Sequence, residues 1–125
     1  MARVSAFGAA SATSPLSALQ IERRPVGEKD VAIDILFCGV CHSDLHPVRS
    51  EWPGTVYPCV PGHELVGRVV EVGGEVARFK AGGLAAVGCI VDSCRRCANC
   101  RAGLEQFCDA GFTGTYNSPG THLGP

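Results

Sequence analysis

The sequence contains four cysteines whose spacing is suited to holding a metal ion. Cys94, Cys97, Cys100 and Cys108 follow one another at intervals of three, three and eight residues. Two residues between thiols allow a tight turn to point both sulfurs at one position, and four thiolates can then surround a zinc ion tetrahedrally at ~2.3 Å. Such a site has no open coordination position. We therefore expect it to be structural and to stabilise a stretch that has few large apolar residues.

Three other uses of these cysteines remain open. An iron–sulfur cluster also takes four cysteines, but the spacing fits neither common ferredoxin pattern. Disulfides would have to join close neighbours, where the bond geometry is poor. Thiols without any ligand are the third alternative. Arg95, Arg96 and Arg101 lie among the cysteines, and their positive charge offsets the extra negative charge that four thiolates leave around a divalent cation. On the cysteine spacing alone, structural zinc is the favoured interpretation.

A second set of candidate ligands lies earlier, in the segments CHSDLH (41–46) and PGHE (61–64). Cys41 and His63 are suitable zinc ligands, and Glu64 can supply an oxygen. Two strong ligands leave such a site incomplete, because a catalytic zinc usually has three protein ligands and one exchangeable position. From the residues alone, a cysteine beside a strand is more often a small packing residue, and a histidine beside glycine is more often a hydrogen-bonded loop residue.

The elements that must position these groups are predicted to be short strands. Apolar and β-branched residues predict the three clearest strands at residues 30–38, 65–72 and 84–91, so that 41–46 follows one strand and 61–64 precedes the next. High glycine and proline contents also favour strands and turns, which predicts a mainly β fold, a small barrel or sandwich with a cysteine-rich lobe at residues 92–109. Weaker patterns predict strands at 3–7 and 19–22, a helical turn at 43–48, an irregular loop at 51–61, a short helix at 102–106 and an aperiodic tail at 111–125.

Composition limits the possible functions. With 125 residues, 46% of them hydrophobic, the chain is the size of one domain with a modest core. A net charge of -1 gives no reason to expect nucleic acid or an anionic membrane surface as a partner, and no apolar run is long enough to span a membrane. Eight cysteines indicate either a secreted, disulfide-bonded protein or thiols that bind metal in a reducing compartment, and we expect the second and hence a cytoplasmic location. The alanine- and serine-rich start is interpreted as a first strand, and Cys38, Cys59 and Cys89 as packing residues.

Three motifs together resemble one enzyme family. FCGVCHSDLH, YPCVPGHELVGRVVEVG and CRRCANCRAGLEQFC occur in this order, and they resemble the zinc-dependent alcohol dehydrogenases of the medium-chain dehydrogenase/reductase superfamily. The similarity is greatest to the cinnamyl-alcohol-dehydrogenase-like branch, whose members reduce aldehydes with NADPH. It extends from the first strand to Tyr116-Asn117, and it implies that residues 1–125 form part of a GroES-like β-barrel catalytic domain.

The resemblance also implies roles for individual residues. It implies that Cys41 and His63 bind a catalytic zinc, that Glu64 can bind it in some states, and that the four late cysteines hold a structural zinc. A proton relay is implied through Ser43 and His46. It also implies that His42 lies near the cofactor pyrophosphate and that Asp44 orients the zinc-bound histidine. It implies that Trp52 lines the substrate pocket, although Trp52 is equally well interpreted as an ordinary aromatic residue.

The sequence departs from the family where the cofactor should bind. No G-x-G-x-x-G follows a strand, and the third ligand of the catalytic zinc is absent with that part, so the chain is expected to be truncated before the Rossmann domain. We expect a fragment of an NADP(H)-dependent enzyme that acts on small alcohols and aldehydes, with a homodimer as one option for the full-length enzyme. Alone it is expected to be inactive. One alternative is a stand-alone zinc-binding barrel with an interaction or regulatory role, and a weaker one is a zinc-free GroES-like remnant without function.

Overall fold

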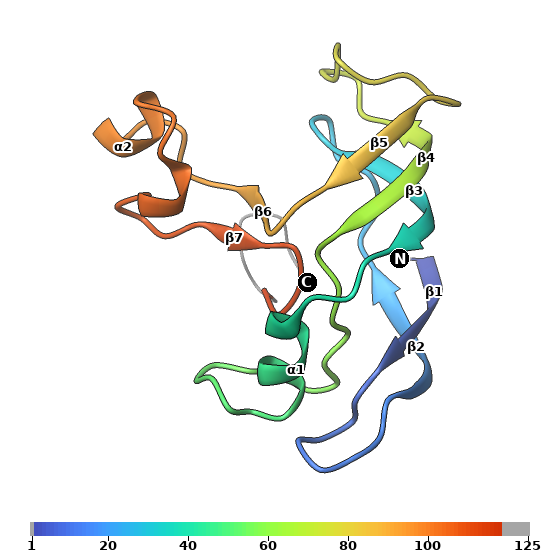
Figure 1. Cartoon of the computed structure of the whole chain (residues 1–125). Helices are drawn as coiled ribbons and strands as arrows, with labels where there is room; N and C mark the ends of the chain where they lie inside the picture. The colour runs from blue at the N-terminus through green and yellow to red at the C-terminus, as the bar shows by residue number, and fades with distance from the viewer. Residues whose placement is uncertain (1, 119–125) are drawn as a thin grey trace.

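Short antiparallel strands make up most of the regular structure. The computed structural model describes residues 2–118 (Figure 1). The mainly β fold class that the sequence predicts is confirmed. The elements are β1 (Ala2–Gly8), β2 (Ser17–Arg23), β3 (Val31–Cys38), α1 (His42–Val48), β4 (Leu65–Val72), β5 (Leu84–Val87), β6 (Ile90–Asp92), α2 (Ala98–Arg101), the 3-10 turn η1 (Glu105–Phe107) and β7 (Thr113–Gly114).

A three-stranded sheet in the order β3-β4-β5 brings the two early motifs together. β3 and β4 are rich in the β-branched residues that favour strands, and they pair antiparallel from Val31 opposite Val72 to Cys38 opposite Leu65. The end of β3 therefore lies beside the start of β4, and the Gly39 N–H donates to the Glu64 carbonyl at 2.8 Å. Because 41–46 follows β3 and 61–64 precedes β4, both segments lie at one end of this sheet.

Two smaller sheets complete the strand content of residues 2–118. β1 and β2 form an antiparallel hairpin, and β6 pairs with β7. The hairpin is tied to the loop before β4 by an isolated bridge in which Ala9 and Cys59 exchange two backbone hydrogen bonds of 2.8 Å. In Figure 1 the segment that carries α2 stands away from the other sheets and is joined to them through β6 and β7.

The core beside α1 is small. Ala9, Val48 and Cys59 are buried together, and the rings of Tyr57 and Tyr116 pack against them. The interpretation of Cys59 as a packing residue agrees with its 2% exposure, whereas the same interpretation is wrong for Cys38 and Cys89, which are exposed. Many large apolar side chains are exposed, among them Phe7, Ile35, Phe37, Val40, Leu84 and Phe107. Within residues 2–118, none of the helices has the length and apolar character needed to cross a bilayer.

An ion pair closes the turn before β3. One Asp30 carboxylate oxygen accepts hydrogen bonds from the Arg24 guanidinium and, at 2.7 Å, from the Gly27 N–H. The hydrogen bond from Arg24 is the largest influence on this carboxyl and holds the pKa of Asp30 below its usual value, although burial acts in the opposite direction. The pair thus stabilises the ionised form of the carboxyl.

The strand predicted at 84–91 is wrong as a single element. β5 ends at Val87 and β6 starts at Ile90, with Gly88 and Cys89 between them. Their carbonyls accept hydrogen bonds from the Thr115 side chain and backbone respectively, so the chain turns here toward the β7 segment. A continuous apolar run has no alternation of apolar and polar residues. The sequence therefore gives no sign that one strand ends there and that the next pairs with a different strand.

The helix predicted at 102–106 is also wrong. The helix in this region is α2, which starts earlier because the Cys97 sulfur accepts a hydrogen bond from the Cys100 N–H at its first turn. Gly103 has a φ of +75° and follows the end of α2, as a helix-terminating glycine does. Only the 3-10 turn η1 overlaps the predicted span. Thr113–Gly114, predicted to lie in an aperiodic tail, forms β7; residues 119–125 of that tail lie outside the described part.

Candidate metal centres

The four late cysteines converge on one point. Their sulfurs all lie within 4.8 Å of one another, and the Cys94 and Cys100 sulfurs are 3.9 Å apart. A disulfide would require a separation of about 2.05 Å. By contrast, four thiolates arranged tetrahedrally around a zinc ion at ~2.3 Å have sulfur–sulfur distances of about 3.8 Å. The spacing of these thiols therefore fits a four-thiolate metal site and does not fit disulfides.

Backbone N–H groups also point at these sulfurs. The Cys97 N–H donates to the Cys94 sulfur at 3.3 Å, the Cys100 N–H donates to Cys97 at 3.4 Å, and the Cys94 N–H donates to Cys108 at 3.4 Å. Such bonds stabilise thiolates. Bonds from the backbone of Arg96 and Cys97 lower the pKa of Cys94 to about 6.

Cys100 behaves in the opposite way. A hydrogen bond with Ser93 lowers its pKa, but burial and the neighbouring thiols of Cys97 and Cys108 outweigh this, and its pKa is raised to about 11. Packing several thiols together thus lowers the pKa of one thiol, Cys94, and raises the pKa of another, Cys100. A bound cation reverses that rise, because it attracts every thiolate in the group. The donor set is therefore suited to a divalent, thiophilic metal such as zinc.

The first ligand group, by which we mean Cys41, His63 and Glu64, also converges. A sulfur, an imidazole nitrogen and a carboxylate oxygen from these residues all lie within 4.8 Å of one another. His63 is buried, Cys41 is half-buried and Glu64 is exposed. Gly39 allows this approach, since a Cβ there would lie 2.4 Å from a Glu64 carboxylate oxygen. These three donors, a sulfur, a nitrogen and an oxygen, fit a zinc ion that keeps a fourth coordination position open.

Asp44 holds both ends of this group. Its carboxylate, buried in α1, accepts hydrogen bonds from the Cys41 N–H at 2.9 Å and from the Gly62 N–H at 3.1 Å. It also lies 3.0 Å from Nδ1 of His63. Since the carboxylate is an acceptor, it selects the tautomer with the proton on Nδ1 and leaves Nε2 of His63 free to bind a metal.

Ser43 lies against the same donors. Its hydroxyl donates to the Cys41 sulfur at 3.1 Å and is 3.5 Å from Nε2 of His63. The hydrogen bond from Ser43 is the largest of the influences that lower the pKa of Cys41, and so it favours the thiolate. Burial opposes protonation of His63, but hydrogen bonds with Cys41 and Asp44 outweigh it and raise the pKa of His63.

His46 belongs to a neighbouring cluster of rings. Its Nδ1 lies 2.5 Å from a Glu51 carboxylate oxygen, and its ring stacks on Trp52 at 4.7 Å and lies 5.1 Å from the ring of His42. Within residues 2–118, no hydrogen bond joins His46 directly to the Ser43 hydroxyl. The structure thus brings the two halves of the predicted relay onto one short helix without linking them. Trp52 is half-exposed and contacts His46.

Sequence reasoning missed Tyr116 and Asn117 as contributors to this region. The Tyr116 hydroxyl donates to the Ser43 carbonyl at 3.0 Å, and its ring stacks on His63 at a centroid distance of 5.8 Å. Asn117 accepts from the Val56 N–H at 2.6 Å through its side-chain oxygen. Burial, followed by the negative charge of Asp44, raises the pKa of Tyr116 to about 12, so its hydroxyl stays protonated at neutral pH. No pattern in the tail marks these long-range contacts.

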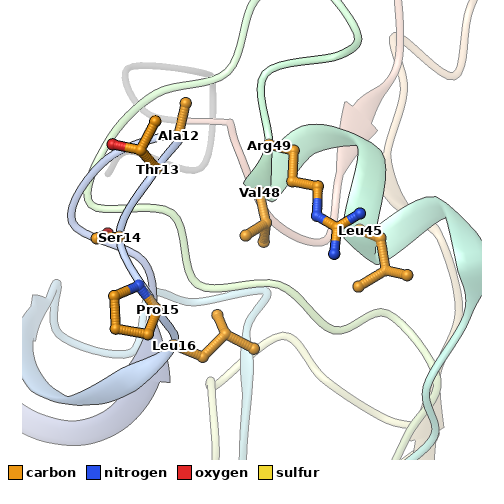
Figure 2. Close-up of a pocket in the computed structure, with 8 residues that line it drawn as sticks. All are labelled: Ala12, Thr13, Ser14, Pro15, Leu16, Leu45, Val48 and Arg49. Atoms are coloured by element: carbon orange, nitrogen blue, oxygen red, sulfur yellow. The ribbon is translucent and has the colours of Figure 1, made fainter.

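A cavity of about 390 Å³ lies between the loop at residues 12–16 and α1 (Figure 2). Leu45 and Val48 of α1 and Arg49 directly after it line the cavity, facing Pro15 and Leu16. No member of the first ligand group lines this cavity, so it is separate from the candidate metal ligands.

Strand pairing that gathers a cysteine, a histidine and a glutamate, together with a lobe of four convergent cysteines, defines a mainly β domain with two groups of side chains that could hold a metal ion. The chain belongs to the family described as the alcohol dehydrogenase GroES-like domain, whose model matches residues 27–123. The resemblance and the GroES-like fold expected from the three motifs are thereby confirmed.

Known proteins of this family are similar over almost the whole chain. An aldehyde reductase of Escherichia coli, YahK, is 62% identical over 94% of this chain and 33% of its own length. The structure of cinnamyl alcohol dehydrogenase from Sorghum bicolor has a TM-score of 0.91 and 42% identity, covering 99% of this chain and 35% of that one. The structure of CAD from Helicobacter pylori, complexed with NADP(H), has a TM-score of 0.88 and 41% identity over 93% of this chain and 33% of that one. The chain spans about one third of the length of these relatives. Since the relatives are dehydrogenases and reductases, they do not favour the alternative of a stand-alone zinc-binding barrel with an interaction or regulatory role.

Proposed function

We propose that the chain is the zinc-binding catalytic part of an NADP(H)-dependent alcohol dehydrogenase or aldehyde reductase, which transfers hydride between a primary alcohol and its aldehyde. The observation that carries this proposal is the convergence of the Cys41, His63 and Glu64 donor atoms within 4.8 Å, with the Ser43 hydroxyl 3.1 Å from the sulfur. Relatives named as aldehyde reductases and cinnamyl alcohol dehydrogenases support it.

A zinc ion held by Cys41 and His63, with Glu64 as an occasional ligand, would supply a Lewis acid that makes an alcohol more acidic and an aldehyde carbonyl more electrophilic. The chain's own residues then have distinct tasks. Asp44 keeps the His63 proton on Nδ1. The Ser43 hydroxyl, beside the sulfur and Nε2, is positioned to take the proton of an alcohol oxygen that approaches these donors.

We propose that this proton continues to His46, whose Nδ1 is held by Glu51. Since no direct hydrogen bond links Ser43 to His46 in the described residues, a bridging hydroxyl of water or cofactor is needed between them. His42, exposed at the start of α1, is assigned to the cofactor pyrophosphate on the resemblance alone. NADP(H) is favoured by the cofactor of the Helicobacter pylori relative.

The remaining assignments complete the proposal. The lobe, residues 92–109, would hold a structural zinc through Cys94, Cys97, Cys100 and Cys108, and residues 1–125 would be part of one catalytic domain. A cytoplasmic location is supported by the need to keep these thiols reduced. A homodimer of the full-length enzyme is proposed from the resemblance.

The test uses the complete polypeptide that carries this sequence. NADPH oxidation is followed with an aromatic aldehyde, and bound zinc is measured by elemental analysis. Cys41→Ser and His63→Ala are expected to lose most turnover and the zinc of the first ligand group. Cys89→Ser serves as the matched control, because Cys89 is an exposed cysteine outside both groups. Equal turnover in Cys41→Ser and Cys89→Ser would refute the proposal.

A further inference from the structure

Tyr116 reaches the first ligand group from far along the chain. Its hydroxyl donates to the backbone carbonyl of Ser43, 73 residues earlier, at 3.0 Å. Its ring stacks on the imidazole of His63, with centroids 5.8 Å apart and planes inclined by 27°. One side chain thus contacts both the first turn of α1 and the buried histidine beside it.

The Ser43 carbonyl needs such a partner. In an α-helix this carbonyl would accept a hydrogen bond from the N–H of the residue four positions later. Here that residue is Pro47, which lies inside α1 and has no N–H to donate. The Tyr116 hydroxyl supplies the missing donor, and it ties the first turn of the helix to the segment after β7.

Tyr116 is itself held firmly enough to act as an anchor. It is half-buried and packs against the core of Ala9, Val48 and Cys59. The next residue, Asn117, bonds to the loop after α1, accepting from the Val56 N–H at 2.6 Å and donating to the Gly54 carbonyl at 3.1 Å. The position of the hydroxyl is therefore set by contacts on both sides of it.

We propose that Tyr116 is a positioning residue that holds the Ser43 hydroxyl against the Cys41 sulfur and the His63 ring. The side chain and backbone of Ser43 move together, so release of the carbonyl lets the hydroxyl leave its 3.1 Å contact with Cys41 and its 3.5 Å approach to His63. This inference rests on the proposed function of the first ligand group.

The test compares two tyrosines that bond to the same helix. Tyr116→Phe removes the hydroxyl and keeps the ring on His63. Tyr57→Phe is the matched control, because Tyr57 packs against the same core but donates to the Val48 carbonyl at 2.6 Å, at the other end of α1. Both variants are made in the complete polypeptide. We measure kcat and KM for an aromatic alcohol, and the ligand-field spectrum of cobalt bound at the first ligand group with zinc kept in the lobe.

Tyr116→Phe is expected to lower kcat by about twofold to tenfold, the value of one neutral hydrogen bond, with KM little changed. It is also expected to shift the cobalt bands, whereas Tyr57→Phe leaves both kcat and the bands close to those of the parent. Identical kcat and spectra for the two variants would overturn the proposal. If the parent lacks alcohol turnover, the proposed function fails, and the cobalt bands alone then decide whether Tyr116 positions the ligands.

A second variant tests whether Tyr116 acts through its hydrogen bond to the Ser43 carbonyl. Pro47→Ala restores an N–H that can bond the Ser43 carbonyl within the helix. In the Tyr116→Phe background it is expected to recover part of the lost kcat and to return the cobalt bands toward the parent. If urea unfolding shows that Tyr116→Phe is unstable, the double variant is compared with the parent instead. A deficit that Pro47→Ala leaves unchanged would contradict the proposed action through Ser43.

Discussion

Replacing Asp44 by asparagine tests the hydrogen bonds that organise the first ligand group. The carboxylate accepts from the Cys41 N–H through one oxygen, and it bonds His63 and the Gly62 N–H through the other. Asparagine has the same size but only one oxygen. If that oxygen serves His63 and Gly62, the amide NH₂ must face the Cys41 N–H, so two donors oppose each other in a buried position.

The magnitude follows from these contacts. A hydrogen bond to a charged group contributes about 1.5–3 kcal/mol, so losing one and weakening two should reduce the free energy of unfolding by about 2–4 kcal/mol. Removing the carboxylate that orients a metal-binding histidine typically weakens metal binding by about 10–100-fold. We therefore expect Asp44→Asn to lose zinc from the first ligand group at chelator concentrations that leave the parent loaded.

The assay combines urea unfolding with zinc competition against a chromophoric chelator, both on the complete polypeptide. Asp34→Asn is the matched control, since Asp34 is an exposed aspartate on β3 and the same charge is removed. It should change the unfolding free energy by less than about 0.5 kcal/mol. Zinc affinity in Asp44→Asn equal to that in Asp34→Asn would refute the assignment of Asp44 as the support of His63.

Three further outcomes are expected. Cys100→Ser should lower bound zinc by about one ion per chain, measured by elemental analysis, because it removes a buried thiolate from the lobe. Gly62→Ala should lower the free energy of unfolding by about 1–3 kcal/mol in urea, since the residue has a φ of +122° and a Cβ there would lie 2.8 Å from the Cys38 sulfur. The hydrogen bond from Arg24 lowers the pKa of Asp30 below its ordinary 3.8, so this carboxylate stabilises the fold above that pH. That contribution should be lost as the pH falls through the lowered pKa, and acid unfolding curves of Asp30→Asn should lack it.

Two of these outcomes have a control variant that separates the named cause from a general effect. Cys89→Ser should keep its zinc, and Gly88→Ala should be neutral, because Gly88 has open space where its Cβ would lie. An unchanged zinc content in Cys100→Ser would count against the lobe as a metal site. A Gly62→Ala variant as stable as Gly88→Ala would contradict the steric reasoning, and identical acid unfolding of Asp30→Asn and parent would contradict the role of the ion pair.

The sequence predicted best what depends on neighbouring residues. The lobe could be recognised because its cysteines are close in the chain, so spacing alone limits where the sulfurs can point. The strands β3 and β4 carry β-branched apolar residues, and their register then brings Cys41 and His63 together. The roles of these residues stay predictions until metal binding is measured.

Long-range side-chain contacts could not be predicted in this way. Nothing in the residues around Tyr116 indicates that its hydroxyl replaces the donor that Pro47 lacks. Likewise, the bond between Glu51 and His46 lies at the edge of a loop whose prolines predict only irregular backbone. Such contacts depend on the folded path of the chain, which local patterns do not encode.

The separation of Tyr116 from Ser43 has a consequence for synthesis in the cell. Residues 94–108 are synthesised within a few seconds of one another, at about 5–20 residues per second, so all four thiols of the lobe become available almost together. Cys41 and His63 emerge earlier, yet the contact from Tyr116 cannot form until a further 73 residues after Ser43 have been made. During that interval the Ser43 carbonyl lacks the hydroxyl that bonds to it in the folded chain, so the first turn of α1 reaches its final arrangement only after the lobe has been made.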